Sequence, residues 1–349
     1  MTDSNAEKRT ELSELGEFGL IDRLTKNINL VQPSTLKGVG DDAAVIDAGD
    51  RVTLVTTDQL NEGIHFDLRY VPLKHLGYKS AIVNFSDIYA MNGTPRQMVI
   101  GLSVSNRFPV EALEEIYEGI LQACKEHSVD LVGGDTTSSA SGLFISITVI
   151  GDAQKEKVCY RNGAKQNDLL CVSGDLGAAY MGLLLLEREK NEFLANPNMQ
   201  PDLSGHPYPL ERQLKPSARK DIIKLLEVHQ IKPTSMIDIS DGLASEIIHI
   251  TTESGCGATI YEDKIPIDPS TVSLAEEFNI IPSIAALNGG EDYELLFTIS
   301  LADYEKIKDI PEISVIGHIT EASAGNNLIS NDGASIPLKA QGWNHMSKN

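Results

Sequence analysis

Apolar and polar residues alternate along this chain with two recurring periods. Between Glu11 and Ile28, apolar residues recur every three or four positions, which predicts a short amphipathic helix. Pro72 favours the start of a second helix, and Asn92-Gly93 favours its end. Together with these two, the pattern predicts helices over 72–91, 110–126, 178–190, 217–229 and 243–253.

Short segments between the helices are β-branched or alternate in polarity, and they predict strands. The clearest is 143–150. The others are 52–57, 98–104, 130–132, 169–172, 236–239, 293–299 and 313–319. Strands and helices follow one another in mixed order, so we expect an α/β fold with mixed sheets. No repeat with a fixed period is visible.

The length and composition indicate two domains. The chain has 349 residues, of which 41% are hydrophobic, and this is enough to form more than one core. After Gly151-Asp152 the sequence becomes charged and loop-like, so the boundary is placed there, giving domains 1–152 and 153–349. Four prolines and a glycine between Asn196 and Pro209 predict a long loop.

Charge narrows the classes of function. The net charge is −21, with an isoelectric point of about 4.7, which argues against nucleic-acid binding and against anionic membranes. The apolar runs are too short to cross a bilayer, and the N-terminus lacks the features of a secretory signal. Four widely spaced cysteines without a Cys-x-x-Cys pair indicate free thiols. We therefore expect a cytoplasmic protein.

Acidic residues beside apolar segments are the main chemical signal. Carboxylates that gather at strand ends repel one another unless cations separate them, and Mg²⁺ suits several oxygen ligands together with phosphates. The pattern therefore predicts a site with several Mg²⁺ ions for phosphate chemistry. The motifs are Gly40-Asp41-Asp42, Thr56-Thr57-Asp58, Asn84-Phe85-Ser86-Asp87, Gly133-Gly134-Asp135, Asp238-Ile239-Ser240-Asp241 and Gly289-Gly290-Glu291-Asp292.

Each motif alone also has a structural interpretation. The segment 38–43 matches the dinucleotide-binding fingerprint in form, but no strand precedes it and a β-like segment follows, so we reject that interpretation. A glycine turn at 38–43, a hairpin at Gly133-Gly134 and a helix N-cap at Asp241 all stay possible. Asp87 is harder to explain in this way, because a buried carboxylate without a partner is costly.

Further candidates stand outside the acidic motifs. Arg161 and Lys165 flank a glycine turn and are candidates to bind phosphate, although an exposed basic loop is the alternative. A lone histidine such as His65 is more often structural. Glu294 alternates with apolar neighbours and is expected to face solvent. Trp343, the only tryptophan, either packs in a core or covers a flat ring.

In their order and spacing, the six motifs resemble those of the thiamine-monophosphate kinase family, a relative of aminoimidazole ribonucleotide synthetase and selenophosphate synthetase. The resemblance runs from about Phe18 to Trp343. It implies an N-terminal domain that binds ATP and Mg²⁺ and forms a homodimer through its sheet. It also implies a C-terminal α/β domain that completes the substrate and metal site.

The resemblance also implies roles for individual residues. Several Mg²⁺ ions would be held by Asp42, Thr56, Thr57, Asp58, Asp87, Asp135, Asp238 and Asp241. ATP would contact Tyr117, Gly134, Asp135, Arg161 and Ser240. Thiamine monophosphate would contact His65, Glu291 and Trp343, with Trp343 near the thiamine rings.

The implied reaction is direct in-line transfer of the γ-phosphoryl group of ATP to thiamine monophosphate, which yields thiamine diphosphate. The acceptor phosphate is largely ionised at neutral pH, so we expect no general base.

Two alternatives remain. One is a related enzyme that uses ATP to activate an amide oxygen or selenide, although selenide chemistry is disfavoured because no cysteine precedes Cys124. The other is an acidic protein that only binds Ca²⁺ or Mg²⁺, although the chain has no EF-hand spacing.

Overall fold

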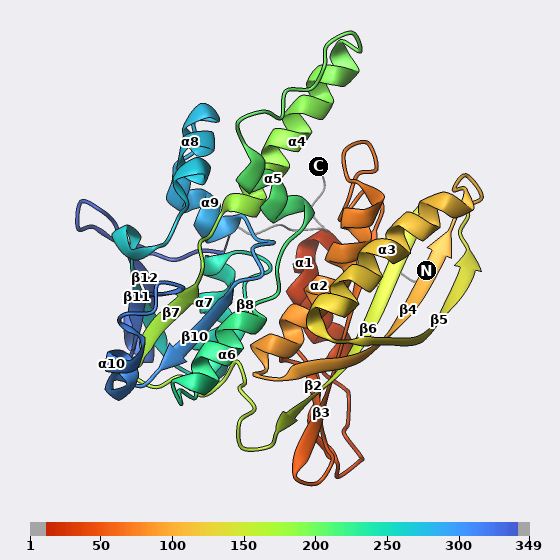
Figure 1. Cartoon of the computed structure of the whole chain (residues 1–349). Coiled ribbons are helices and arrows are strands. Elements are labelled where there is room, and N and C mark those ends of the chain that lie inside the picture. Colours follow the sequence, from red (N-terminus) through yellow and green to blue (C-terminus); the bar gives the residue numbers. More distant parts are fainter. Residues whose placement is uncertain (1–11, 341–349) are drawn as a thin grey trace, which may run out of the picture.

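A computed structural model describes residues 12–340, which form two mixed β-sheets with helices packed around them (Figure 1). The first sheet has the strand order β1-β2-β3-β6-β4-β5, and only its β4–β5 pair is parallel. The second has the order β13-β12-β9-β11-β7-β10-β8, and only its β12–β9 pair is parallel. The expected α/β class with mixed sheets is confirmed.

The bounds of the elements follow the chain. The first sheet consists of β1 (Thr35–Lys37), β2 (Ala44–Asp47), β3 (Arg51–Asn61), β4 (Thr94–Val104), β5 (Asp130–Ser138) and β6 (Leu143–Gln154). The second consists of β7 (Leu169–Ser173), β8 (Ser235–Asp238), β9 (Gly257–Tyr261), β10 (Leu295–Ile299), β11 (Ile313–Thr320), β12 (Asn326–Ile329) and β13 (Ser335–Pro337). The α-helices are α1 (Leu12–Thr25), α2 (Leu73–Ala90), α3 (Val110–His127), α4 (Ala178–Ala195), α5 (Pro207–Leu214), α6 (Lys220–Val228), α7 (Leu243–Ser254), α8 (Pro269–Glu277), α9 (Pro282–Asn288) and α10 (Tyr304–Ile307).

Helix α2 is the most deeply buried helix of the first half. It packs between α3 and strands β3 and β6, and fourteen of its residues are buried. Two glycines allow the close helix contact: a Cβ atom at Gly77 would lie 1.9 Å from the carbonyl oxygen of Ile116, and one at Gly119 would lie 1.9 Å from that of Lys74. This packing fixes the carboxyl end of α2, which carries Asp87.

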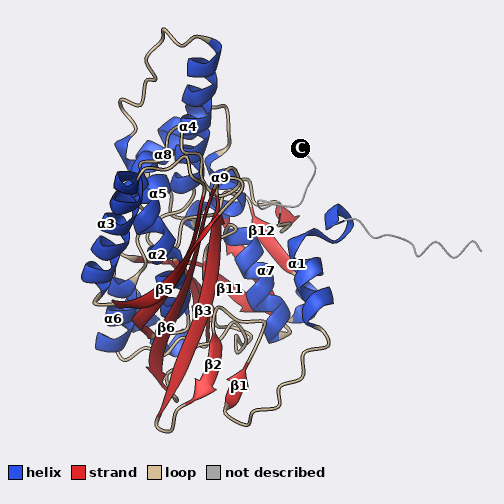
Figure 2. Cartoon of the chain, turned by 90° about the vertical axis from the view of Figure 1, so that its right-hand side faces the viewer, coloured by secondary structure: helices blue, strands red, loops and turns tan. Residues whose placement is uncertain are grey.

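The two faces of the first sheet differ. Alternate residues of β6, such as Ile145 and Ile147, are buried against the helices. The residues between them point to the other face, where Val99, Val132 and Ile150 are 36%, 58% and 37% exposed. In Figure 2, β3 and β6 stand in the foreground with α2 and α3 to their left. One face of this sheet is therefore covered and the other is open.

The second sheet is covered on both faces. Leu296 of β10 packs with α7, while Leu295 and Phe297 of the same strand pack with α6. All five residues of β10 are buried, as expected for a strand with helices on both sides. Within residues 12–340, no helix is both long and apolar enough to cross a membrane.

Three elements differ from the sequence prediction. Gly133-Gly134-Asp135 lies inside β5 rather than in a turn, because Gly134 lets β5 approach β4 closely: a Cβ atom there would lie 2.1 Å from the carbonyl oxygen of Ile100. The proline-rich loop ends at His206, and Pro207 begins the short helix α5, a position that proline favours. Helix α1 is broken at Gly16, whose φ is 65°.

Candidate functional site

Three aspartates meet where α2 approaches β8. Asp42 precedes β2, Asp87 lies in the last turn of α2, and Asp238 ends β8. One carboxylate oxygen from each lies within 4.8 Å of the others. We call these three residues the acid cluster. It joins segments that are almost two hundred positions apart in the sequence, as the motif pattern predicted.

Short hydrogen bonds hold the acid cluster in place. The hydroxyl of Thr56 donates to Asp87 at 2.5 Å, and the hydroxyl of Ser86 donates to Asp238 at 2.6 Å. The backbone N–H of Asp58 donates to the side-chain oxygen of Asn84 at 3.0 Å, which fixes β3 against α2. Thr56 and Asp58 therefore lie at the acid cluster, as expected.

Burial and mutual repulsion disfavour the ionised forms of these acids. Burial raises the pKa of Asp58 to about 6. Burial and the charge of Asp42 raise the pKa of Asp238 to about 7. The pKa of Asp87 lies well above its ordinary value because of burial and then because of Asp58, Asp238 and Asp42. Without a cation, the cluster is therefore strained by its own charge at neutral pH.

The acid cluster fits Mg²⁺. All its donor atoms are carboxylate oxygens, the ligands that this hard cation prefers. One oxygen of Asp42, Oδ2, is buried and has no hydrogen-bond partner in the described structure. A buried acceptor of this kind needs an explanation, and a cation supplies one. Asp42, Asp87 and Asp238, with Asp58 beside them, are therefore the residues that would hold it.

We expect Mg²⁺ to raise the melting temperature of the protein more at about pH 8 than at about pH 5. The folded-state pKa values of Asp58 and Asp238 are raised to about 6 and about 7. Their stabilising contribution is therefore complete only below the unfolded pKa of about 4 and is lost as pH rises through these values. Above about pH 7 the carboxylates are ionised and repel one another, and there a cation has most to offset.

Differential scanning fluorimetry with MgCl₂ checks this expectation, with NaCl at the same ionic strength as the control. An equal shift of the melting temperature at both pH values would contradict the assignment of the acid cluster as a cation site.

Arg161 is the cation nearest to the acid cluster. Its Nη2 atom lies 2.7 Å from Oδ1 of Asp42, and its backbone N–H donates to Asp41 at 3.2 Å. Burial and the charge of Asp42 raise the pKa of Asp41 to about 6. Arg161 is therefore not the exposed basic loop residue of the alternative interpretation, and it is held where it can reach a phosphate bound at the cluster.

The segment after β8 links the acid cluster to the 289–294 loop. The backbone N–H of Glu291 donates to the carbonyl oxygen of Ser240 at 2.7 Å. Helix α7 begins at Leu243 with Gly242 as its N-cap residue and has no side-chain capping bond, so Asp241 is not its cap. Ser240 and Asp241 therefore lie between the acid cluster and Glu291.

His65 and Glu291 converge on a buried lysine. The Nζ atom of Lys79, on α2, lies 2.9 Å from Oε1 of Glu291, and Lys79 is only 6% exposed. Lys79 lines a small cavity together with His65, Tyr70 and Gln213. Two of the three residues expected to contact thiamine monophosphate are thus brought together. The third, Trp343, lies outside the described residues.

Other expected site residues lie elsewhere in this chain. Thr57 points away from Thr56, and its hydroxyl donates to the carbonyl oxygen of Ile147 at 3.0 Å. Asp135 is on β5, three strands from β3 and so about 14 Å away. It lines a separate cavity on the open face of the first sheet together with Gln59 and Ser103. Tyr117, on α3, packs against the first core, and Gly134 lies within β5.

Comparisons with known proteins identify the family. Residues 40–153 match the family described as AIR synthase related protein, N-terminal domain. The thiamine-monophosphate kinase of Bacillus subtilis (strain 168) is 34% identical over 95% of this chain and 99% of that relative. The kinase of Aquifex aeolicus (strain VF5) is also 34% identical, over 96% and 99%. The chain belongs to the thiamine-monophosphate kinase family.

Solved structures agree with this family. The structure of AaThiL complexed with AMPPCP and TMP has a TM-score of 0.82 at 32% identity and covers 97% of this chain and 100% of that one. The hydrogenase maturation protein HypE in complex with ATP has a TM-score of 0.65 at 18% identity and covers 97% of this chain and 100% of that one. That second likeness shows the shared fold alone. The family and the fold expected from the motifs are both confirmed.

Two charged residues in this member of the thiamine-monophosphate kinase family escaped the sequence analysis. Lys79 stands in an apolar stretch of α2, and its burial follows only from the contact of that helix with α5. Glu246, in the first turn of α7, is 2% exposed, and its carboxylate accepts the backbone N–H of Asp241 at 3.0 Å. A charge at an apolar helical position was the available signal, and it had been applied only to Asp87.

Proposed function

We propose that this protein transfers the γ-phosphoryl group of ATP to thiamine monophosphate, giving thiamine diphosphate and ADP in thiamine diphosphate biosynthesis. The observation that carries the proposal is the acid cluster of Asp42, Asp87 and Asp238 beside Arg161. Support comes from the 32% identity to AaThiL, whose structure is complexed with AMPPCP and TMP.

Each group of residues has a proposed task. Mg²⁺ ions, when bound, neutralise the charge of the phosphates that meet in the site. The acid cluster, with Thr56, Asp58 and Asp241, holds these ions, and Arg161 and Ser240 contact ATP. Lys79 holds Glu291 beside the cavity lined by His65, which suits the acceptor. We keep Trp343 as a contact of the thiamine rings, and Thr57, Tyr117, Gly134 and Asp135 as contacts of ATP or its metal ions.

The residues present require no general base. The second pKa of a phosphate monoester is about 6, so the acceptor oxygen is largely ionised at neutral pH. The difficulty of the reaction is the repulsion between two anions, and alignment together with charge neutralisation overcomes it. The transfer is therefore proposed to be direct and in line, without a phosphorylated enzyme.

The test is an assay of purified protein with MgATP and thiamine monophosphate that follows thiamine diphosphate directly, with unphosphorylated thiamine as the control acceptor. Product from the monophosphate alone supports the proposal. ATP binding without product would refute the acceptor and favour another ATP-dependent reaction of the wider group. Mg²⁺ binding without ATP binding would favour a passive metal binder.

We propose further that two copies of the chain pair through the open face of the first sheet. Val99, Val132 and Ile150 expose apolar surface there, and an uncovered apolar sheet face favours association. The proposed domains are 1–152 and 153–349, since the first sheet ends at Gln154 and the second begins at Leu169. The compartment is proposed to be the cytoplasm, which agrees with four cysteines that are free thiols.

We expect Val132→Asp to convert the dimer into a monomer, because a buried unpaired carboxylate at an interface costs several kcal/mol. Light scattering after size-exclusion chromatography measures the change in mass. Val110→Asp is the matched control: Val110 is 68% exposed at the start of α3, away from the sheet. A dimer that survives Val132→Asp would contradict pairing through this face.

A further inference from the structure

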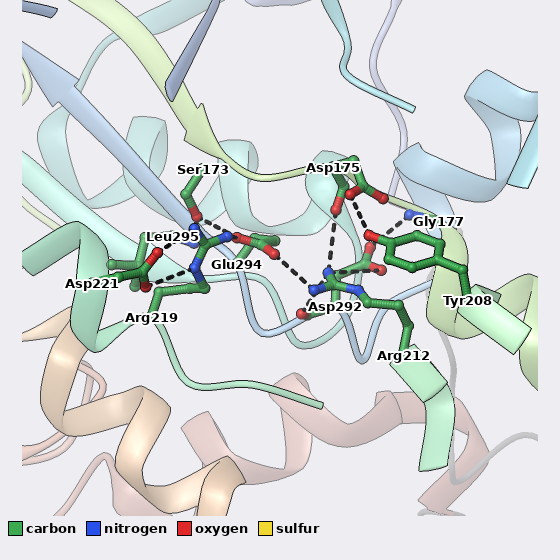
Figure 3. Close-up of polar contacts among 10 residues, drawn as sticks. All are labelled: Ser173, Asp175, Gly177, Tyr208, Arg212, Arg219, Asp221, Asp292, Glu294 and Leu295. Carbon is green, nitrogen blue, oxygen red and sulfur yellow. Dashed lines mark hydrogen bonds and ion pairs between the residues drawn. The ribbon is translucent and has the colours of Figure 1, made fainter. Parts of the chain in front are cut away.

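A second group of buried charges contains no member of the acid cluster (Figure 3). Its anions are Asp175, Asp292 and Glu294, and its cations are Arg212 and Arg219. Asp292 and Glu294 are 0% exposed, so their charges need partners inside the protein. The group joins α5, the start of α6, the loop after β7 and the 289–294 loop.

Arg212 holds the 289–294 loop by its backbone as well as by charge. Its Nη1 atom lies 2.9 Å from Oε1 of Glu294. Its Nη2 atom donates to the carbonyl oxygens of Asp292 at 3.1 Å and of Asp175 at 3.2 Å. Arg219 and Ser173 bind the other oxygen of Glu294. One guanidinium therefore ties the loop before β10 to the loop after β7, as Figure 3 shows.

The 289–294 loop needs such a restraint. Glu291 and Tyr293 have φ values of 58° and 51°, in the left-handed region that side chains rarely adopt. Such conformations persist only where the surrounding contacts enforce them. Two backbone bonds help, from Glu291 to Ser240 at 2.7 Å and from Tyr293 to Ile239 at 2.9 Å. Arg212 restrains the loop from its other side.

The next residue of α5 reaches the side chain of Glu291. The amide nitrogen of Gln213 donates to Oε2 of Glu291 at 2.9 Å. The carbonyl oxygen of Gln213 accepts from Nζ of Lys79 at 3.1 Å, and the same Nζ lies 2.9 Å from Oε1 of Glu291. Both oxygens of Glu291 are thus held, one directly by α5 and the other through Lys79.

We infer that α5 positions the acceptor-binding carboxylate: Arg212 fixes the backbone of the 289–294 loop, and Gln213 orients Glu291. The inference rests on the proposed function of Glu291 as a contact of thiamine monophosphate. The described contacts of Arg212 and Gln213 include none with the acid cluster. Both are therefore positioning residues whose effect falls on the acceptor and not on ATP.

The first test is Gln213→Met, which keeps the length of the side chain and removes its amide. We expect the KM and the Kd for thiamine monophosphate to rise about tenfold, the effect of losing a hydrogen bond to a charged group. The kcat and the KM for MgATP stay unchanged. Steady-state kinetics and calorimetric titration with thiamine monophosphate measure these values. Unchanged acceptor values, or an equal rise in both KM values, would overturn the inference.

Arg212→Lys tests the loop itself, because lysine keeps the charge but cannot span the two carbonyl oxygens. We expect the same selective rise in the KM for thiamine monophosphate. Should this variant fail to fold, Gln213→Met still decides the question. Tyr208→Phe is the matched control: its hydroxyl, on the same helix, donates to Asp175 and makes no described contact with the 289–294 loop. It should leave the acceptor KM as it is.

A double-mutant cycle separates positioning from general damage. If Gln213 acts through Glu291, then adding Gln213→Met to Glu291→Gln causes no further rise in the acceptor KM. Additive effects would refute action through Glu291. A parent protein that turns over thiamine monophosphate while Gln213→Met matches it refutes the inference alone. A parent protein that neither binds nor phosphorylates thiamine monophosphate refutes the proposed function and, with it, the inference.

Discussion

The Asp87→Asn variant is expected to lose roughly 10³-fold in kcat while remaining folded. Asp87 shares the acid cluster with Asp42 and Asp238, and its pKa is raised by burial and by these neighbours. Asparagine keeps the shape and can still accept the hydroxyl of Thr56, now 2.5 Å from the carboxylate. It removes one negative charge, so the metal-free fold should melt no lower than the parent protein, while the cluster loses a ligand for Mg²⁺.

Two measurements decide this prediction. The coupled assay gives kcat, and thermal unfolding in EDTA gives the stability without metal. Asp50→Asn is the matched control, because Asp50 is an exposed acid in the turn before β3 and should be neutral in both measurements. An unfolded Asp87→Asn protein would assign Asp87 a structural role, and full activity would remove it from the site.

Local pattern predicted the elements whose burial depends on one neighbouring layer. Helix α3 has one buried stripe, and β6 alternates between a covered and an open face, so both periods are visible in the sequence. Helix α5 was missed because Pro207 and Pro209 suggested a loop, although proline favours a first helical turn. The glycines of β5 suggested a turn because their reason, the close approach of β4, is a tertiary contact.

The candidate site could be predicted only in part. The acids at strand and helix ends identified Asp42, Asp87 and Asp238 as neighbours, since a buried carboxylate requires a partner or a cation. The distance of Asp135 from them follows from strand order, which a single sequence does not reveal. Thr56 and Thr57 are adjacent in the chain and point to opposite faces of β3. Only the sheet separates their environments.

Glu294 shows why alternation misled the analysis. It was expected to face solvent because apolar residues flank it, and this expectation was wrong: Glu294 is 0% exposed. The rule of alternation assumes one wet face, whereas helices cover both faces of the second sheet. Burial raises the pKa of Glu294, and the guanidinium groups of Arg212 and Arg219 oppose that rise. Its partners therefore keep this buried carboxylate in the charged form.

Glu294→Leu is expected to lower the free energy of unfolding by about 3–5 kcal/mol, because removing one partner leaves buried charges uncompensated. Arg212 would lose its partner at 2.9 Å, and Arg219 would keep only Asp221. Glu294→Gln should cost less, since its amide oxygen still accepts from one guanidinium. Urea and thermal unfolding of the parent protein and both variants measure the difference.

A surface pair provides the matched control. Glu118 lies 3.4 Å from Lys74, and both side chains are at least half exposed, so Glu118→Leu should change the stability by less than about 1 kcal/mol. The contrast between Glu294→Leu and Glu118→Leu then isolates burial as the cause, because each variant removes one carboxylate from an ion pair. Equal and small losses from both would mean that the charges at 292–294 are solvated in the folded protein. In that case Arg212 could not restrain the loop that carries Glu291, and the stability measurement would count against the positioning role of α5.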